Sequence, residues 1–185
     1  MGSNDLTGAI LIIAYVGYVF FYPIFEFWDM RSIEYKIHEK INLERQQQGL
    51  PPLSFDSKLQ SAARNHSNDM GIKNYFEHVS PDGTTPTSRG KTAGYNCFKM
   101  YGGGYSDGLG ENIAKMPIAS SFGLMAIFPW AIWNDKTTVA SQTVESWMNS
   151  PGHRENILTP HYSTEGIGVY RKPLDTYVYI TEDFC

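Results

Sequence analysis

The stretch "SPGHRENILTP", residues 150–160, places a histidine, an arginine, a glutamate and an asparagine within a few positions of a Ser-Pro-Gly turn. It follows residues 138–149, where apolar side chains recur at helical spacing. We interpret this as a turn that ends an amphipathic helix and presents His153. The inward stripe predicted for the helix is Ala140, Val144, Trp147 and Met148, and Glu145 falls outside it.

Two further helices are indicated before this stretch. Residues 31–48 predict a helix that "GLPPL" at 49–53 ends, and Asp56 or Ser57 can cap a second one that runs to about Lys73. Ile33, Ile37, Ile41 and Leu43 lie near one side of the first, and Leu59, Ala62, Ala63, His66 and Met70 form the stripe of the second. A core histidine with one hydrogen bond is favoured for His66 over a site role.

Two strands are indicated after it. "EGIGVYRK" at 165–172 and "TYVYITEDF" at 176–184 alternate like two antiparallel strands. Helices around a small sheet predict the α+β class or a three-layer α-β-α sandwich.

Composition excludes several classes of protein. The 185 residues suit one domain plus an appendage, and the net charge of −4 lacks the basic footprint of a nucleic-acid-binding protein. Neither a Walker motif, nor G-x-S-x-G, nor H-E-x-x-H occurs.

The N-terminal segment predicts a membrane anchor. Residues 8–25, "GAILIIAYVGYVFFYPIF", carry no charge over 18 positions, enough to cross a hydrocarbon core as a helix. A cleavable signal peptide is disfavoured because a basic n-region and a small-x-small site are missing, and a buried core helix is the third alternative. We therefore expect an anchor at 1–30 and a domain at 31–185.

The charged residues that flank the apolar segment leave its orientation in the membrane ambiguous. Arg31, Lys36, Lys40 and Arg45 follow the apolar segment, and nothing basic precedes it. Taken literally, the positive-inside rule leaves the domain in the cytoplasm. These four residues also fall in the first predicted helix, where their charge has other uses.

Two loops carry candidate site residues. In "NYFEHVSPDGTTP", 74–86, His78 stands just before a Ser-Pro-Asp-Gly turn, and in the glycine-rich "YGGGYSDGLGENIAK", 101–115, Glu111 ends the loop. A structural alternative stays open, in which Glu111 accepts backbone N–H groups and His153 holds the adjacent turn.

The motifs "FEHVSPDG", "GENIA", "SWMNSPGHRENIL" and "EGIGV" resemble those of the CAP superfamily. This group includes cysteine-rich secretory proteins, antigen 5 and plant pathogenesis-related proteins. The resemblance covers about residues 34–184 and is to the prokaryotic type. It implies an α-β-α sandwich with a central antiparallel sheet and a large cleft. It also implies an extracytoplasmic location, in place of the literal reading of the charges. Together with the predicted anchor, this gives a single-pass membrane protein whose domain is extracytoplasmic.

The resemblance also implies a site. His78, Glu111 and His153 match the family's two histidines and one of its two glutamates, while Ser150 occupies the position of the second glutamate. Glu145 and Glu155 are substitutes outside that position. Two imidazoles and a carboxylate suffice as zinc ligands, with a fourth position left for water. Arg154, Asn156 and Asn112 are expected to be structural hydrogen-bonding residues.

Three function classes remain open. The first is a non-catalytic cleft module that binds a divalent metal, zinc before others, and an extracellular ligand such as a lipid or small molecule. The second is a metal-dependent hydrolase or peptidase with a His-His-Glu site. The third is a structural or adhesive domain whose motifs maintain the fold.

Cys97 and Cys185 are the two cysteines of the chain. In an oxidising compartment a disulfide would tie the C-terminal strand to the loop before "GENIA". Cysteine count does not decide between this pairing and two free thiols.

Residues 117–133, "PIASSFGLMAIFPWAIW", carry no charge. A loop folded onto the domain's own core is one interpretation. The other is a hydrophobic lip that contacts the membrane near the anchor, since interfacial tryptophan suits that place. The second interpretation predicts at least two exposed rings on one face among Phe122, Phe128, Trp130 and Trp133.

Overall fold

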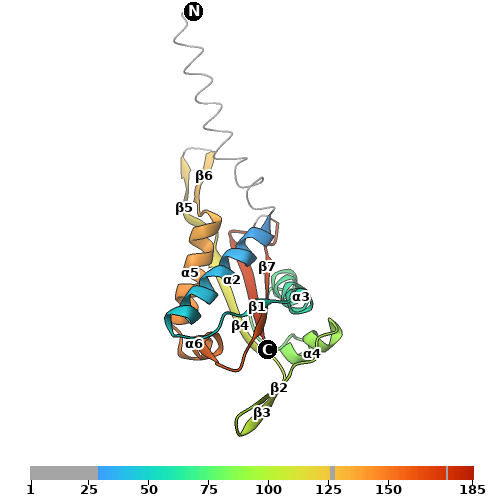
Figure 1. Cartoon of the computed structure of the whole chain (residues 1–185). Coiled ribbons are helices and arrows are strands. Elements are labelled where there is room, and N and C mark those ends of the chain that lie inside the picture. Colours follow the sequence, from blue (N-terminus) through green and yellow to red (C-terminus); the bar gives the residue numbers. More distant parts are fainter. Residues whose placement is uncertain (1–28, 126–127, 174) are drawn as a thin grey trace, which may run out of the picture.

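The computed structural model describes residues 29–125, 128–173 and 175–185, with the side chains of 121–133 outside the description. Its elements lie in two helical layers around a small sheet, with two hairpins at opposite ends (Figure 1). The helices are α2 (Met30–Gln47), α3 (Ser57–Lys73), α4 (Pro86–Thr92), α5 (Lys136–Met148) and α6 (Pro151–Leu158). The strands are β1 (Ser54–Phe55), β2 (Phe98–Tyr101), β3 (Gly104–Asp107), β4 (Gly110–Pro117), β5 (Ala119–Met125), β6 (Phe128–Trp133), β7 (Thr164–Tyr170) and β8 (Tyr177–Phe184).

The central sheet is mixed, in the order β1-β7-β8-β4. β7 and β8 pair antiparallel as predicted, and β4 pairs antiparallel with β8. β1, however, runs parallel to β7, so the prediction of an antiparallel sheet is wrong at this edge. A parallel pair needs a long crossover rather than a hairpin, and a strand of two residues is too short for an alternating pattern.

Helices α2, α5 and α6 cover one face of the sheet. Ile33, Ile37 and Ile41 of α2 are fully buried there with Trp147 of α5, as the helical spacing predicts. Leu43, predicted on the same side, is 54 % exposed. The buried stripe of α2 is therefore narrower than the set of apolar residues predicted to form it.

Helix α3 covers the opposite face at very short range. Its bounds and its cap by Asp56 are as predicted, and all five residues of its predicted stripe are buried. A Cβ on Gly166 or Gly168 would lie 2.1 Å from a backbone nitrogen of α3. The two glycines of β7 therefore let the helix rest directly on the strand.

Helix α6 replaces the turn predicted for residues 150–160. Pro151 occupies the first turn, where its missing N–H costs nothing, and the helix continues to Leu158. Arg45 of α2 is fully buried beside its end, and its guanidinium donates to the carbonyls of Ile157 and Thr159 at 2.7 and 3.0 Å. The cations predicted to follow the anchor thus belong to a folded helix.

Two segments expected as loops are hairpins. The glycine-rich 101–115 contributes to the β2–β3 hairpin and to β4, and 117–133 contains the β5–β6 hairpin. The four aromatic rings on which the lip hypothesis depends lie outside the described side chains. Residues 1–28 of the anchor predicted at 1–30 also lie outside the description, and Met30 already begins α2. Within the described ranges no helix is long and apolar enough to span a membrane.

Cys97 and Cys185 form a disulfide, with their Cα atoms 5.7 Å apart. It ties the chain just before β2 to the residue after β8, where both cysteines are buried with Leu59. The pairing predicted as one of two outcomes is confirmed.

Replacing both cysteines by serine removes a cross-link across 88 residues. We expect the free energy of unfolding to fall by about 4–5 kcal/mol, because the unfolded chain regains the entropy of an open loop. Urea unfolding followed by circular dichroism measures the change. Thiol reduction of the wild type should give the same loss, and a loss below ~1 kcal/mol would contradict the expectation.

Gly168→Ala should lower the free energy of unfolding by at least ~2–3 kcal/mol, because its Cβ forces α3 off the sheet. Gly152→Ala is the matched control, since a Cβ at Gly152 meets nothing within 4 Å. Equal midpoints of urea unfolding for the two variants would show that the close approach contributes little.

Candidate functional site

The buried carboxylate of Glu111 is the centre of the site. Glu111 is the second residue of β4, and its side chain is only 2 % exposed. Oε1 accepts a hydrogen bond from Nδ1 of His78 at 2.8 Å, and Oε2 accepts one from the Arg89 guanidinium. Both oxygens are therefore engaged by cationic or polar side chains of the protein.

Arg89 of α4 also shapes the segment that carries His78. Its guanidinium donates to the carbonyl of His78 at 3.0 Å and to that of Thr84 at 3.1 Å. Between them, Gly83 N–H donates to the carbonyl of Ser80 at 2.8 Å, which confirms the predicted Ser-Pro-Asp-Gly turn. One arginine thus fixes both the carboxylate and the loop opposite it.

His66 lies beneath this pair. Its ring is fully buried on α3, with Nε2 3.0 Å from the Glu77 carbonyl and 3.9 Å from Oε1 of Glu111. Burial lowers the pKa of His66, so the neutral imidazole is favoured. The favoured interpretation of a core histidine with a hydrogen bond is confirmed, and this core histidine also supports the floor of the site.

Asp183 is a second buried carboxyl group beside Glu111. The two residues face each other across β4 and β8, and neither oxygen of Asp183 meets a donor among the described groups. Burial, and then the negative charge of Glu111, raise the pKa of Asp183 well above its ordinary value. The protonated acid is favoured, and its own proton can serve a hydrogen bond to Glu111.

His153 lies in α6, whose backbone is bonded to the strand that carries Glu111. Asn112 donates to the His153 carbonyl at 3.2 Å, while Asn156 donates to the Glu111 carbonyl at 3.1 Å and to Oδ1 of Asn112 at 2.9 Å. These amides fasten α6 to β4, which is the structural role expected for them. Burial, and then the charge of the nearby His78, lower the pKa of His153.

The structure therefore pairs His78 with Glu111 and fastens the backbone of His153 to Asn112, the neighbour of Glu111, but leaves the two substitute glutamates outside. The convergence of the three side chains on one ion stays a prediction. Glu145 and Glu155 are both exposed. Glu155 lines a shallow hollow between α5 and α6 with Arg154 and Met148, and no contact joins either glutamate to Glu111. The gap left by Ser150 in the family pattern is filled by neither.

Sequence reasoning missed Arg89 and Asp183. Arg89 lies in the short "PTSRGKT" helix, which offers no pattern that marks a buried cation. Asp183 does carry a signal, because strict alternation along β8 puts it on the same face as Tyr179 and Thr181, all of them buried.

The arrangement bears on the predicted zinc ligands. Within the described ranges no three His, Cys, Asp or Glu side chains are grouped so as to hold a metal ion. Glu111 instead orients His78 through Nδ1, as outer carboxylates do for metal-binding histidines, and leaves Nε2 of a half-exposed ring available. Zinc binding stays a prediction, carried by the two histidines.

A separate acidic cluster lies on the other face of the sheet. Glu165 pairs with Nδ1 of His38, and Glu182 accepts from Asn112 at 3.3 Å. Burial, and then a hydrogen bond with Glu165, raise the pKa of Glu182 well above its ordinary value. Both carboxyl groups are fully buried, so this cluster belongs to the core.

Arg89→Ala should leave the Glu111 carboxylate buried beside Asp183 without its cation. We expect a loss of about 3–5 kcal/mol in the free energy of unfolding, as for other broken buried ion pairs. Lys91→Ala, an exposed cation of the same helix, is the control and should stay within ~0.5 kcal/mol of wild type. Thermal unfolding at neutral pH distinguishes the two.

His78 and His153 should titrate on opposite sides of the ordinary histidine pKa of about 6.5. The bond to Glu111 raises the pKa of His78, so its contribution to stability is complete below that value and is lost as the pH rises through the higher folded pKa. The pKa of His153 is lowered, so its effect is the reverse: stability falls as the pH drops below the ordinary value. NMR titration of the ring protons measures both, and an unchanged His78 pKa in Glu111→Gln would contradict the assignment.

Comparison with known proteins identifies the family to which this fold belongs. The model of the cysteine-rich secretory protein family, CAP, matches residues 38–184. Protein YkwD of Bacillus subtilis (strain 168) is 38 % identical over 137 residues, which are 74 % of this chain and 42 % of the relative. The membrane protein YlbC of the same organism is 30 % identical over 151 residues, 82 % of this chain and 34 % of the relative. The chain spans less than half the length of these relatives.

Solved structures agree. An extracellular protein containing an SCP domain from Bacillus anthracis str. Ames superposes with a TM-score of 0.59 at 28 % identity, covering 83 % of this chain and 40 % of that one. An outer surface protein of Borrelia burgdorferi shares the fold, with a TM-score of 0.58 at 22 % identity and coverage of 84 % and 93 %. From its motifs, its fold and the match over 38–184, this chain belongs to the CAP family of cysteine-rich secretory proteins.

Proposed function

We propose that this chain is a membrane-anchored, extracytoplasmic binding module that holds a ligand at His78 and His153 without transforming it. The observation that carries the proposal is the engagement of Glu111. Arg89 and His78 each hydrogen-bond one of its two oxygens, and its side chain is only 2 % exposed, so this carboxylate is poorly placed to take a proton from water or substrate.

The two fully buried groups of the cluster are also poor catalysts. Asp183 and His66 are fully buried, the first favoured as the acid and the second as the neutral base. His78 and His153 are the partly exposed titratable groups of the cluster. Imidazoles at a surface cleft suit hydrogen bonding to a ligand, or coordination of zinc through a nitrogen.

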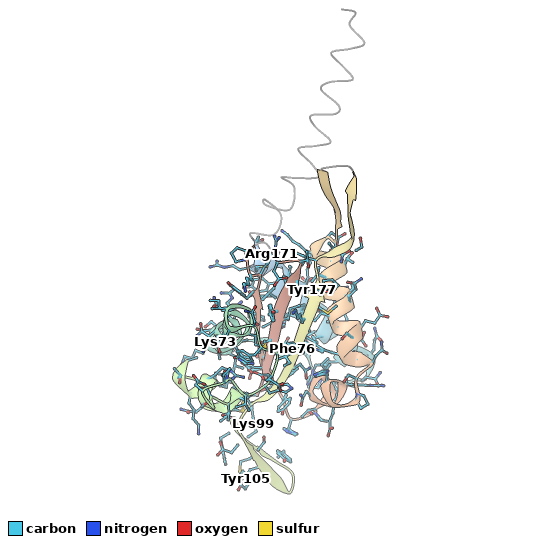
Figure 2. The ribbon with its side chains drawn as sticks, turned by 180° about the vertical axis from the view of Figure 1, so that it is seen from behind. Lys73, Phe76, Lys99, Tyr105, Arg171 and Tyr177 are labelled. Atoms are coloured by element: carbon cyan, nitrogen blue, oxygen red, sulfur yellow. A yellow bond between two sulfur atoms is a disulfide. The ribbon has the colours of Figure 1, made fainter. Side chains whose placement is uncertain are left out.

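The surroundings of His78 indicate the class of ligand. Phe76 and Val79, close to it in sequence, are 44 % and 49 % exposed, and Figure 2 shows Phe76 on the side of the molecule that carries α3. Glu111 raises the pKa of His78, which favours an anionic or acceptor-rich group beside its ring. An amphiphile with a polar head and an apolar body, such as a lipid, matches this combination.

Two sets of observations support the membrane-anchored, extracytoplasmic location. The uncharged residues 8–25 have the length of a membrane span, and one relative is named as a membrane protein. A similar solved structure is that of an extracellular protein, and the disulfide suits an oxidising compartment.

A metal-dependent hydrolase is the second candidate. The His78–Glu111 pair supports this candidate, because a carboxylate-bound imidazole with an available Nε2 is a competent general base. A screen of ester, amide and glycoside substrates with added zinc separates the two candidates, because turnover abolished by His78→Ala would refute pure binding.

Zinc titration of the full chain in detergent tests the metal. Calorimetry should show one site in the wild type and at least tenfold weaker binding in His78→Ala and in His153→Ala. His161→Ala is the control, because that ring stacks on Tyr101 outside the cluster. Equal affinity in all four proteins would exclude these histidines as ligands.

Lipid binding has its own test. Mass spectrometry of the purified full chain should find a co-purified amphiphile that is depleted in His78→Ala and retained in His161→Ala. If neither zinc nor an amphiphile distinguishes these variants, the domain is structural or adhesive and the binding proposal is wrong.

A further inference from the structure

The hairpin of β5 and β6, which we call the apolar ribbon, stands apart from the main sheet. The two strands pair with each other in a separate two-stranded sheet. In Figure 1 the ribbon projects beyond the end of α5, away from the four-stranded sheet. Along the described part of the chain, no other helix or strand packs extensively on either of its strands. The backbone of the ribbon therefore stands apart from the other described helices and strands.

The sequence of the apolar ribbon gives it no polar face. Residues 117–133 contain no charge. Gly123 is paired with Trp130 and Met125 with Phe128, and the alternate pairs are Phe122 with Ala131 and Leu124 with Pro129. Because alternate pairs of a ribbon belong to opposite faces, both faces are composed mainly of apolar residues. A hairpin in water normally keeps one face polar.

Such a hairpin is not expected to persist alone in water. An isolated two-stranded hairpin is marginally stable, and large exposed apolar surfaces generally have a partner. The partner must accept apolar residues on both faces at once. A protein groove buries one face readily, whereas the interfacial region of a bilayer surrounds an inserted ribbon.

The base of the apolar ribbon lies beside the start of α2. Nζ of Lys136, three residues beyond β6, is 3.9 Å from the carboxylate of Asp29. Asp29 in turn comes four residues after the uncharged segment 8–25. Figure 1 shows the beginning of α2 and the ribbon at the same end of the domain. The two longest uncharged segments of the chain thus meet the domain at one place.

We propose that the apolar ribbon inserts into the membrane that holds the N-terminal anchor, as a second attachment of the domain to the bilayer. The inference rests on the anchoring part of the proposed function. It also has a consequence for the site, because β4 leads from Glu111 to the ribbon. Glu111 and Pro117, near its two ends, are separated by about 20 Å of extended chain, so the Glu111 cluster lies about that far from the base of the ribbon.

The four tryptophans of the full chain allow a direct test: Trp28, Trp130, Trp133 and Trp147. The protein is reconstituted in phosphatidylcholine–phosphatidylglycerol vesicles with and without brominated acyl chains, which quench tryptophan on contact. In a Trp28→Phe background, brominated lipid should at least halve the emission that Trp130 and Trp133 contribute. After both are also changed to phenylalanine, the remaining Trp147 is buried in the core and should be unaffected.

The outcomes separate the two attachments. Quenching of Trp28 without quenching of Trp130 and Trp133 would overturn insertion of the ribbon and leave the anchor intact. No quenching of any tryptophan would overturn both. Shielding of Trp130 and Trp133 from brominated lipid and from aqueous iodide alike would mean that protein, such as a second copy of the chain, covers the ribbon, which also refutes insertion.

A variant pair checks the assignment to this hairpin. Leu124→Lys should reduce the quenching of Trp130 and Trp133 at least twofold, since a charge opposes insertion. The β2–β3 hairpin supplies the control, because it exposes aromatic side chains at the other end of the domain (Figure 2, Tyr105). Tyr105→Ser should leave the quenching unchanged, and equal effects of the two substitutions would contradict the proposal.

Discussion

The close approach of α3 to β7 is the constraint on which the rest of the structure depends. Because Gly166 and Gly168 lack a Cβ, the backbone of the helix rests on the backbone of the strand. Ser67 completes the contact by donating to the Gly168 carbonyl at 2.9 Å. With α3 seated so deeply, His66 reaches within 3.9 Å of Glu111 two strands away. The geometry of the site therefore depends on two glycines, which have no side chain to hold the helix away from the strand.

Charge balance around Glu111 is the second constraint. A single buried carboxylate is costly, and here Arg89 neutralises it while Asp183 avoids a second negative charge by favouring its proton. The same carboxylate also holds His78, whose ring is half-exposed at the outer side of the cluster. The need to balance this buried charge explains why four segments distant in sequence meet at one point.

The domain has two chemically different ends. Strand β4 begins at Glu111's cluster and finishes beside the apolar ribbon, with the disulfide at the cluster end and Asp29–Lys136 at the other (Figure 1). One end thus gathers titratable groups and the other uncharged sequence. The four-stranded sheet lies between the two ends and separates the Glu111 cluster from any surface that the apolar end contacts.

Local patterns were sufficient for much of this architecture. The stripe of α3, the inner side of α5 and the antiparallel β7–β8 pair were predicted because each depends on side-chain periodicity within one segment. The motif positions of His78, Glu111 and His153 also followed from the sequence. Tertiary structure alone decided the rest: the parallel β1, the helix in place of the turn at 150–160, the Cys97–Cys185 pairing, and the burial of Arg89 and Asp183 around Glu111. These features arise from contacts between distant segments, whose energies depend on burial and on partners that no single window of sequence contains.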